Sequence, residues 1–299
     1  MSRRYAEAGL ALNTVLWGAT FVLVKAALRD VSAVLFLALR FGLATLVLGV
    51  VFRRSLAGAT EGLRSPAARR GGVLTGLLLF AGFFFQTQGL RFTTPAKSAF
   101  LTGLTTVLVP LVAACVYKVR PRAFEVVGVL TATLGMGLMT LEWPVGSIGR
   151  GDVLTLVCAV AFAGHIVTLG HFSALVSYPV LSVGQVGAAA AASIALLPAA
   201  GIPRMAWQPA VIWAILVSGL LSTALAFTIQ AWAQRYTTST RTALIYALEP
   251  VVAWVTSFLV AGEGLTGHAA VGAVLILAGV LLVELKRLDS TAHPKVSAR

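Results

Sequence analysis

The sequence predicts an all-α membrane protein whose ten transmembrane helices form two inverted repeats of five helices each. Three observations predict this fold: an apolar composition, ten apolar runs of membrane-spanning length, and a similarity between the two halves of the chain. Of the 299 residues, 58% are apolar and only 11% are charged, and the mean hydropathy is +0.91. Soluble domains carry about 45–50% apolar and about 25% charged residues, so a water-soluble protein of this length is excluded.

The apolar runs define the expected helices, because a membrane-spanning helix needs about 20 mostly apolar residues. The first run is too long for the apolar region of a signal peptide and contains Trp17 and Lys25, so we count it as a span. The long gap at residues 53–71 holds five arginines and is predicted to be a solvated loop. The expected spans are 8–28, 32–52, 72–91, 95–117, 122–141, 152–171, 181–200, 209–234, 239–261 and 267–286.

The basic residues predict the orientation of these spans. With the N-terminus inside, the inner segments hold most of the 23 Lys and Arg residues, and only Arg29, Arg91, Lys97, Arg150 and Arg204 fall outside. Cytoplasmic loops are rich in Lys and Arg, so both termini are expected in the cytoplasm. The net charge of +13 therefore reflects topology, and no nucleic-acid partner is expected.

An internal repeat appears when the chain is shifted by 144 residues. Each copy would hold five spans, an odd number, so the second copy must enter the membrane from the opposite side. Inverted repeats are typical of secondary transporters, which bind substrate at the midplane between the copies. A duplication kept only for structural symmetry is the alternative. We expect a first repeat at 1–145, a second at 146–290 and a cytoplasmic tail at 291–299. The shift aligns Gln86 with Gln230, Arg91 with Arg235, Lys97 with Arg241, Gly128 with Gly272 and Gly135 with Gly279.

Short motifs at ordered positions add a resemblance to a known family. They are Trp17-Gly18-Ala19-Thr20-Phe21 followed by Lys25, then Arg40-Phe41, Leu248-Glu249-Pro250 and Gly262-Glu263. Together with the repeat, they resemble the EamA-type carriers of the drug/metabolite transporter superfamily over nearly the whole chain, and within it the aromatic amino-acid exporters of the YddG type. The resemblance implies a multi-pass inner-membrane carrier that exports amino acids, amines or other small metabolites through a central cavity.

The sequence departs from the family pattern in its first half. Thr106 stands opposite Pro250, and Lys118-Val119 stands where the second half has Gly262-Glu263. These differences leave open whether the two halves move as equivalents.

Ionisable residues within spans are costly, so each has a functional and a structural interpretation. Glu249 could face the cavity and bind a substrate amine or carry a coupling proton. It could instead donate, when protonated, to the carbonyl of Tyr246, which Pro250 leaves without its helical donor. Arg40 could lock helices through an ion pair or a carbonyl contact, snorkel outward, or bind a substrate carboxylate. Lys25 lies at the outer end of the first span, where snorkelling is cheap.

Amides, a histidine and aromatic rings complete the expected binding site. Gln86 and Gln230 could bind the amino and carboxyl groups of a substrate or link helices. His165 could titrate near neutral pH or serve as an interhelical donor. The aromatic rings predict an apolar cavity. We therefore expect substrate to be bound by Trp17, Thr20, Phe21, Gln86, His165, Gln230, Tyr246 and Glu249, with no metal and no cofactor.

A carrier is the expected function. The sequence lacks the paired acids, zinc-binding histidine pair, activated serine and phosphate-binding loop that intramembrane enzymes or ATPases need. A channel would need a filter or rings of like charge. We expect an exporter of aromatic or apolar amino acids. The alternatives are an intramembrane enzyme, a channel, or a carrier of other drugs or amines. The expected partners are the small-molecule substrate and membrane lipids, and the oligomeric state stays open.

Overall fold

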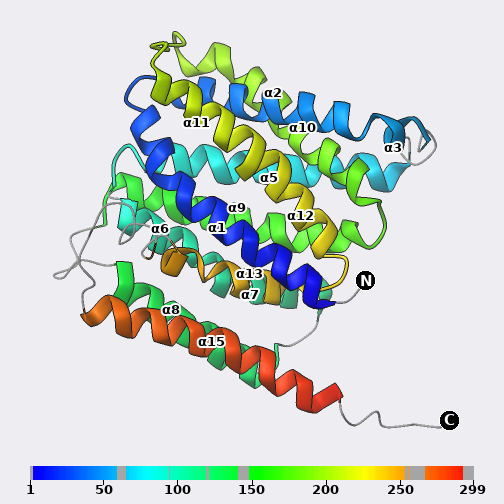
Figure 1. The fold of residues 1–299 in the computed structure, drawn as a ribbon, viewed down its shortest axis with the longest axis vertical. Coiled ribbons are helices and arrows are strands. Elements are labelled where there is room, and N and C mark those ends of the chain that lie inside the picture. The colour runs from blue at the N-terminus through cyan, green and yellow to red at the C-terminus, as the bar shows by residue number, and fades with distance from the viewer. Residues whose placement is uncertain are drawn as a thin grey trace.

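The computed structural model describes residues 3–58, 65–93, 95–118, 121–140, 148–252, 255 and 267–291. The named elements in this part of the chain are helices, and one isolated bridge joins Val31 to Met205. The long helices lie side by side with similar axial directions (Figure 1). The protein is therefore an all-α bundle.

Seven described helical segments are long and apolar enough to cross a membrane. Two shorter apolar helices, within α8 (Ala123–Thr140) and α15 (Gly267–Thr291), accompany them. The expected ninth span extends beyond the described residues at 253–254 and 256–261. The seven segments are α1 (Arg3–Ala27), α2 (Ala33–Val51), α5 (Pro66–Gly89), Ser98–Tyr117, α9 (Arg150–Ser173), Tyr178–Ala199 and Pro209–Ala233.

The expected loop at 53–71 is partly helical, so that prediction is wrong for two described stretches. A short helix, α3, spans Arg53–Gly58, and α5 already begins at Pro66. The side chain of Ser65 accepts a hydrogen bond from the backbone N–H of Ala68 at 3.1 Å. Proline has no backbone N–H that the first helical turn would leave unpaired, so Ser65 and Pro66 together start the helix before the apolar run.

Three of the expected spans are interrupted helices. The fourth divides at Leu104 into α6 (Pro95–Gly103) and α7 (Thr105–Tyr117). The eighth consists of α11 (Pro209–Gly219), a π-helical segment η2 (Leu220–Leu225) and α12 (Ala226–Ala233). In the ninth, α13 (Ser239–Tyr246) ends at a turn, and the chain resumes as helix at Glu249. Pro250 explains this turn because its ring and missing N–H break the helical ladder.

The helices pack in a consistent spatial order (Figure 1). α8 and α15 lie together along one edge of the bundle, and α2 packs with α10 (Tyr178–Leu196) at the other. Between these edges, α5 packs against α9, and α1 packs against α12 and α13. We call the end where α1 begins and α15 ends the terminal end of the bundle.

Four glycines allow α8 and α15 to approach closely. A Cβ atom on Gly128 would lie 2.8 Å from the carbonyl oxygen of Gly279, and one on Gly135 would lie 2.5 Å from that of Gly272. The earlier glycine of α8 contacts the later glycine of α15, and the later one of α8 contacts the earlier one of α15, so the two helices are antiparallel. Small residues at such contacts are typical of helix packing in membranes.

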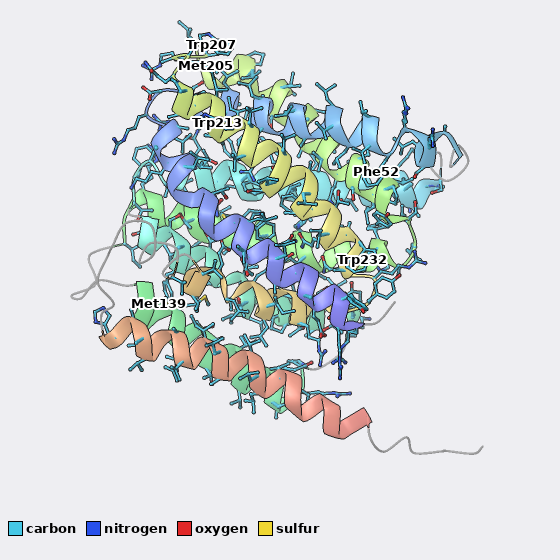
Figure 2. The ribbon with its side chains drawn as sticks, viewed as in Figure 1. Phe52, Met139, Met205, Trp207, Trp213 and Trp232 are labelled. Carbon is cyan, nitrogen blue, oxygen red and sulfur yellow. The ribbon has the colours of Figure 1, made fainter. Side chains whose placement is uncertain are left out.

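The outer surface suits a lipid environment. Large apolar side chains on several helices are exposed, including Leu46, Leu134 and Val274. Figure 2 shows Trp207 and Trp213 at the end opposite the terminal end, and Trp232 near the terminal end. Trp207 is 78% exposed and Trp213 is 62% exposed. Tryptophan is enriched where a bilayer meets water, so these residues indicate the two membrane boundaries.

Candidate functional site

A buried amide on α1 connects three helices near the middle of the bundle. Asn13 is fully buried, and its Nδ2 donates to the carbonyl oxygen of Ala226 on α12 at 2.9 Å and to the Tyr246 hydroxyl on α13 at 3.3 Å. The Oδ1 atom of Asn13 is buried and has no hydrogen-bond partner among the described residues. Buried polar atoms are nearly always paired, so this oxygen marks a position for a water or a ligand donor.

Trp17 lies one turn further along α1 and contacts two rings. Its centroid is 4.7 Å from that of Tyr246, in an edge-on arrangement, and 5.5 Å from that of Phe227. The indole Nε1 donates to the carbonyl oxygen of Ser222 in η2 at 2.9 Å. Thr20, on the same helix, accepts a hydrogen bond from the Ser222 hydroxyl at 3.2 Å. The π-helical segment therefore holds Trp17 and Thr20, two residues of the Trp17–Phe21 motif, in place.

Glu249 places a carboxylate beside this aromatic pair. It follows the turn at the end of α13 and is half-buried. Its charge acts electrostatically on Tyr246 and on the thiol of Cys158 on α9, which places the three groups in one neighbourhood. No described residue forms a hydrogen bond with this carboxylate. The hydrogen bond from Glu249 to the carbonyl of Tyr246, which the sequence allowed, is therefore not formed. A partly accessible, unbonded carboxylate at membrane depth is expensive, and such groups usually have a function.

Gln86 reaches the same region from α5. Its Nε2 donates to the Thr102 hydroxyl at 3.4 Å, and that hydroxyl lies 3.9 Å from the Cys158 sulfur. Polar side chains from α1, α5, α6, α9, α13 and the residue that follows its terminal turn, Glu249, thus gather in one region. We call it the central polar cluster and define it as Asn13, Trp17, Gln86, Thr102, Cys158, Tyr246 and Glu249.

His165 is joined to a different partner. It is 1% exposed, and its Nε2 lies 2.9 Å from Oε1 of Gln185 on α10. The Nε2 of Gln185 donates in turn to the carbonyl oxygen of Phe227 at 3.4 Å. The ring of Phe227 contacts both His165 and Trp17, so one aromatic ring separates His165 from the central polar cluster.

Gln230 lies on the same face of α12 as Ala226, one turn nearer the terminal end. Its Nε2 donates to Oε1 of Gln234 at 3.1 Å, and Gln234 donates to the carbonyl oxygen of Ile166 at 2.9 Å. The Oε1 of Gln230 is buried without a partner among the described residues. Asn13 and Gln230 therefore each carry a buried acceptor oxygen that has no donor among the described residues.

Arg40 is buried beside the π-helical segment. Its Nε donates to the Thr223 hydroxyl at 2.6 Å, and its Nη2 donates to the carbonyl oxygen of Ser222 at 3.4 Å. The guanidinium carbon lies 4.1 Å from the ring centroid of Phe83. Arg40 therefore makes the kind of carbonyl contact that links helices. Lys25, in the last turn of α1, is half-buried.

The sequence model of the EamA-like transporter family matches residues 5–141 and, a second time, residues 149–285. The chain belongs to the EamA-like transporter family. An uncharacterized transporter of Archaeoglobus fulgidus is 33% identical over 288 residues, covering 96% of this chain and 88% of that protein. The uncharacterized transporters YyaM and YoaV of Bacillus subtilis are 26% and 22% identical, covering 90% and 92% of this chain and 90% and 94% of their own lengths.

A solved structure supports the fold. It is described only as the crystal structure of a protein, and it superposes with a TM-score of 0.77 at 22% identity, covering 96% of this chain and 99% of its own. Family membership, together with the apolar helices, makes this EamA-family protein a multi-pass membrane transporter.

Several residues of the cluster were not singled out from the sequence. Asn13, Thr102 and Cys158 lie within apolar runs, and so does Gln185, which lies outside the cluster. The cost of an amide within a span is a signal that could have selected Asn13 and Gln185. The side chain of Phe21 lies outside the described residues, as do Gly262 and Glu263. Thr106, which replaces a proline of the family pattern, donates to the carbonyl oxygen of Ala243 at 3.2 Å.

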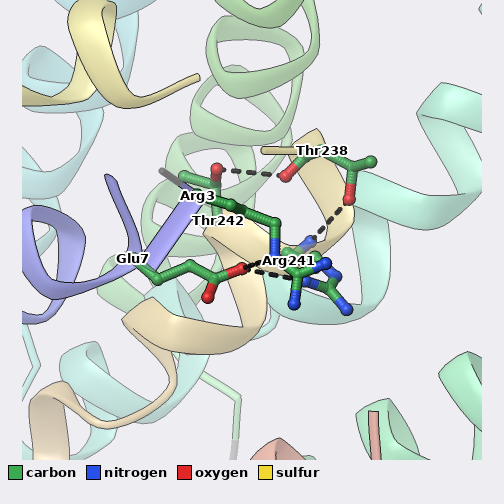
Figure 3. A network of polar contacts seen from close by, with 5 residues as sticks. All are labelled: Arg3, Glu7, Thr238, Arg241 and Thr242. Carbon is green, nitrogen blue, oxygen red and sulfur yellow. Dashed lines mark hydrogen bonds and ion pairs between the residues drawn. The ribbon is translucent and has the colours of Figure 1, made fainter. Parts of the chain in front are cut away.

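Ion pairs connect α1 to the start of α13 at the terminal end (Figure 3). Oε1 of Glu7 lies 2.8 Å from Nε of Arg3 and 2.8 Å from Nη1 of Arg241. Thr238 caps α13 by accepting a hydrogen bond from the backbone N–H of Arg241. In this EamA-family transporter, α1 and α13 are therefore joined on the terminal side of the central polar cluster.

Proposed function

We propose that the protein is a secondary transporter that exports aromatic and apolar amino acids across the inner membrane by alternating access. The observation that carries the proposal is the central polar cluster, where the Trp17–Tyr246 ring pair lies near Glu249, whose carboxylate has no hydrogen-bond partner among the described residues. Rings and a carboxylate at one position suit a solute with an apolar side chain and an ammonium group.

The cluster supports specific roles for its members. The rings of Trp17 and Tyr246 would pack against the substrate side chain, as aromatic groups do in offset or edge-on arrangements. Glu249 and the free Oδ1 of Asn13 would accept hydrogen bonds from the ammonium group. The amide of Gln86 would donate to the carboxylate. These interactions are few, which suits a carrier that must release its substrate.

An inverted five-helix repeat accounts for several observations together. The two family matches begin 144 residues apart, which is the offset of the sequence repeat. The 144-residue offset makes Gly128 equivalent to Gly272 and Gly135 equivalent to Gly279. Replacing each glycine of the Gly128–Gly279 contact by its equivalent gives the Gly135–Gly272 contact, as a two-fold relation between the repeats requires. In this arrangement, the interruptions in the fourth, eighth and ninth spans provide the places where helices could bend between conformations.

The orientation follows from the basic residues. Arg3 and the arginines of α3 lie at the terminal end, and so do Arg235 and Arg241. We propose that this end faces the cytoplasm. Reporter fusions at both termini should be active only in the cytoplasm, and a periplasmic C-terminus would contradict both the ten-span arrangement and the inverted repeat.

Transport by purified protein in proteoliposomes tests the function. Saturable counterflow of phenylalanine, with competition by tryptophan and leucine but not by glutamate or lysine, is the expected result. A channel would show no counterflow, and an enzyme would change the solute chemically. Movement of charged solutes alone would show that the proposed substrate class is wrong.

A carrier of aromatic amines is the second candidate. The central polar cluster offers two acceptors for an ammonium group, the Glu249 carboxylate and Asn13 Oδ1. It contains no Lys or Arg that would bind a substrate carboxylate, which favours an amine. Phenylethylamine has the ring and the ammonium group of phenylalanine without its carboxylate. If phenylethylamine exchanges and phenylalanine does not, the amine carrier is the correct assignment.

A further inference from the structure

A cavity lies at the terminal end, away from the central polar cluster. Its volume is about 250 Å³, and it is lined by Arg3, Arg235, Tyr236, Thr237, Thr238 and Arg241. Each of these side chains carries a guanidinium or a hydroxyl group. Among these described lining residues there is no carboxylate, so the cavity presents hydrogen-bond donors and positive charge.

The donors in this cavity differ in how they are used. Glu7 binds Arg3 and Arg241 through one carboxylate oxygen, which fixes both guanidinium groups beside the cavity. Arg241 is only 1% exposed, so its charge acts in a poorly solvated position. Arg235 is exposed and makes no ion pair with a described residue. The buried Thr237 hydroxyl also has no hydrogen-bond partner among the described residues.

We propose that this cavity binds an oxyanion, a carboxylate or a phosphate, which Arg235 and the Thr237 hydroxyl contact directly. Guanidinium groups bind both anions with paired, charge-assisted hydrogen bonds. The fixed charges of Arg3 and Arg241 add attraction, and Glu7 offsets one of them. The ligand is either a free solute or the headgroup of an anionic lipid, because both carry the same oxygen atoms.

The neighbouring cavity connects this site with the proposed function. It has a volume of about 340 Å³, shares Thr237 and Thr238 with the arginine-lined cavity, and is also lined by Pro110 and Tyr117 of α7. Tyr117 follows Pro110 by seven positions in the helix, so this cavity reaches about 10 Å along α7. If the terminal end is cytoplasmic, as the proposed function holds, a solute carboxylate would meet the arginines before the solute enters the bundle.

The test measures binding by the purified full-length protein, independently of transport. Inorganic phosphate and acetate, each compared with chloride at the same ionic strength, should raise the thermal unfolding temperature, because a ligand of the folded state stabilises it. Arg235→Gln should weaken binding roughly tenfold, the size of one charge-assisted hydrogen bond. Arg204→Gln, at an exposed arginine on the opposite end, should leave binding unchanged.

A second arm identifies the source of the anion. If the ligand is a lipid headgroup, native mass spectrometry of the parent protein purified with phosphatidylglycerol should show bound lipid. The Arg204→Gln variant should retain this lipid, and the Arg235→Gln variant should lose it. Thr237→Val provides an independent variant without a charge change, and it should weaken whichever ligand binds. If Arg235→Gln behaves like the parent protein in both arms, the oxyanion site does not exist.

The proposed function can fail without this site failing. Glu249→Gln, in the central polar cluster, should leave phosphate and acetate binding intact. If the protein binds oxyanions through Arg235 but exchanges no amino acid, the oxyanion site is supported and the proposed function as an amino-acid carrier is wrong.

Discussion

The indole nitrogen of Trp17 donates a hydrogen bond to the carbonyl oxygen of Ser222, 205 residues away in the chain. That carbonyl belongs to the π-helical segment, and the Nη2 of Arg40 also donates to it at 3.4 Å. One backbone oxygen therefore receives donors from the first and second spans. π-Helical segments are frequent at functional sites, and here the segment positions a ring of the central polar cluster.

Replacing Trp17 should separate its two contributions. Trp17→Phe keeps a ring but loses the donor to Ser222, and we expect about 1 kcal/mol lower stability, the usual net value of one hydrogen bond. Trp17→Ala should also remove phenylalanine transport, because it deletes the ring that packs on Tyr246. Unfolding in detergent and counterflow in vesicles measure the two effects. The control is Trp213→Phe, at a lipid-facing position, and equal transport by Trp17→Ala and the parent would contradict the proposed role.

The carboxylate of Glu249 should matter more for transport than for folding. Glu249→Gln keeps the shape of the side chain but removes its charge, and the side chain has no described hydrogen bond to lose. We expect phenylalanine counterflow to fall about tenfold, as for one lost charged hydrogen bond, at nearly unchanged protein yield. Asp30→Asn, an exposed acid outside the spans, is the matched control. Loss of folded protein with normal transport per molecule would make Glu249 a structural residue.

The α8–α15 contact should tolerate no added methyl group. Gly135→Ala would place a Cβ atom 2.5 Å from the Gly272 carbonyl oxygen and 2.8 Å from the backbone nitrogen of Ile276. Because backbone atoms cannot rotate away, we expect a loss of about 1–3 kcal/mol.

Gly49→Ala in α2 is the matched control for this contact. Its added Cβ would meet nothing within 4 Å, so helix propensity should make the change neutral or stabilising by about 0.5–1 kcal/mol. Thermal unfolding of both variants decides the matter, and identical curves would mean that the two helices do not touch there.

The two arginines bound to Glu7 should contribute unequally to stability. Arg241 is 1% exposed and the Arg3 side chain is 34% exposed, so solvent screens only the second pair strongly. Glu7→Gln leaves a buried guanidinium without its carboxylate and should cost about 3 kcal/mol. Arg3→Gln should cost under about 1 kcal/mol. Unfolding at low and high salt gives the measurement, and a Glu7→Gln effect that vanishes in salt would contradict the burial of this pair.

Much of the fold could be predicted because it depends on properties local to each segment. Apolar runs long enough to cross a bilayer specify where helices lie, and α2, α9 and α10 occupy the expected runs. The seven-residue spacing of Gly128 with Gly135, and of Gly272 with Gly279, places each pair on one helix face, and these faces meet. The helical start at Pro66 was missed because a serine cap and a proline, not apolar residues, specify it.

The candidate site was only partly predictable. Trp17, Gln86, Tyr246 and Glu249 were expected to bind substrate, and the structure brings them into one region. Asn13 and Cys158 complete that region; the buried amide is the signal that could have selected Asn13, and Cys158 has no such signal in its helix. His165 and Gln230 bond instead to Gln185 and Gln234, which were not expected as partners.

The sequence by itself determined the membrane environment, the positions of most long helices and the clustering of positive charge in particular segments. These depend on transfer free energy and charge summed along single segments. Only the tertiary structure decided which buried polar groups find partners. The donor and acceptor of Asn13 and Ala226 lie 213 residues apart, and those of Arg40 and Thr223 lie 183 apart. A hydrogen bond depends on a few tenths of an ångström and on direction, so such pairs form only when helix packing brings the atoms together.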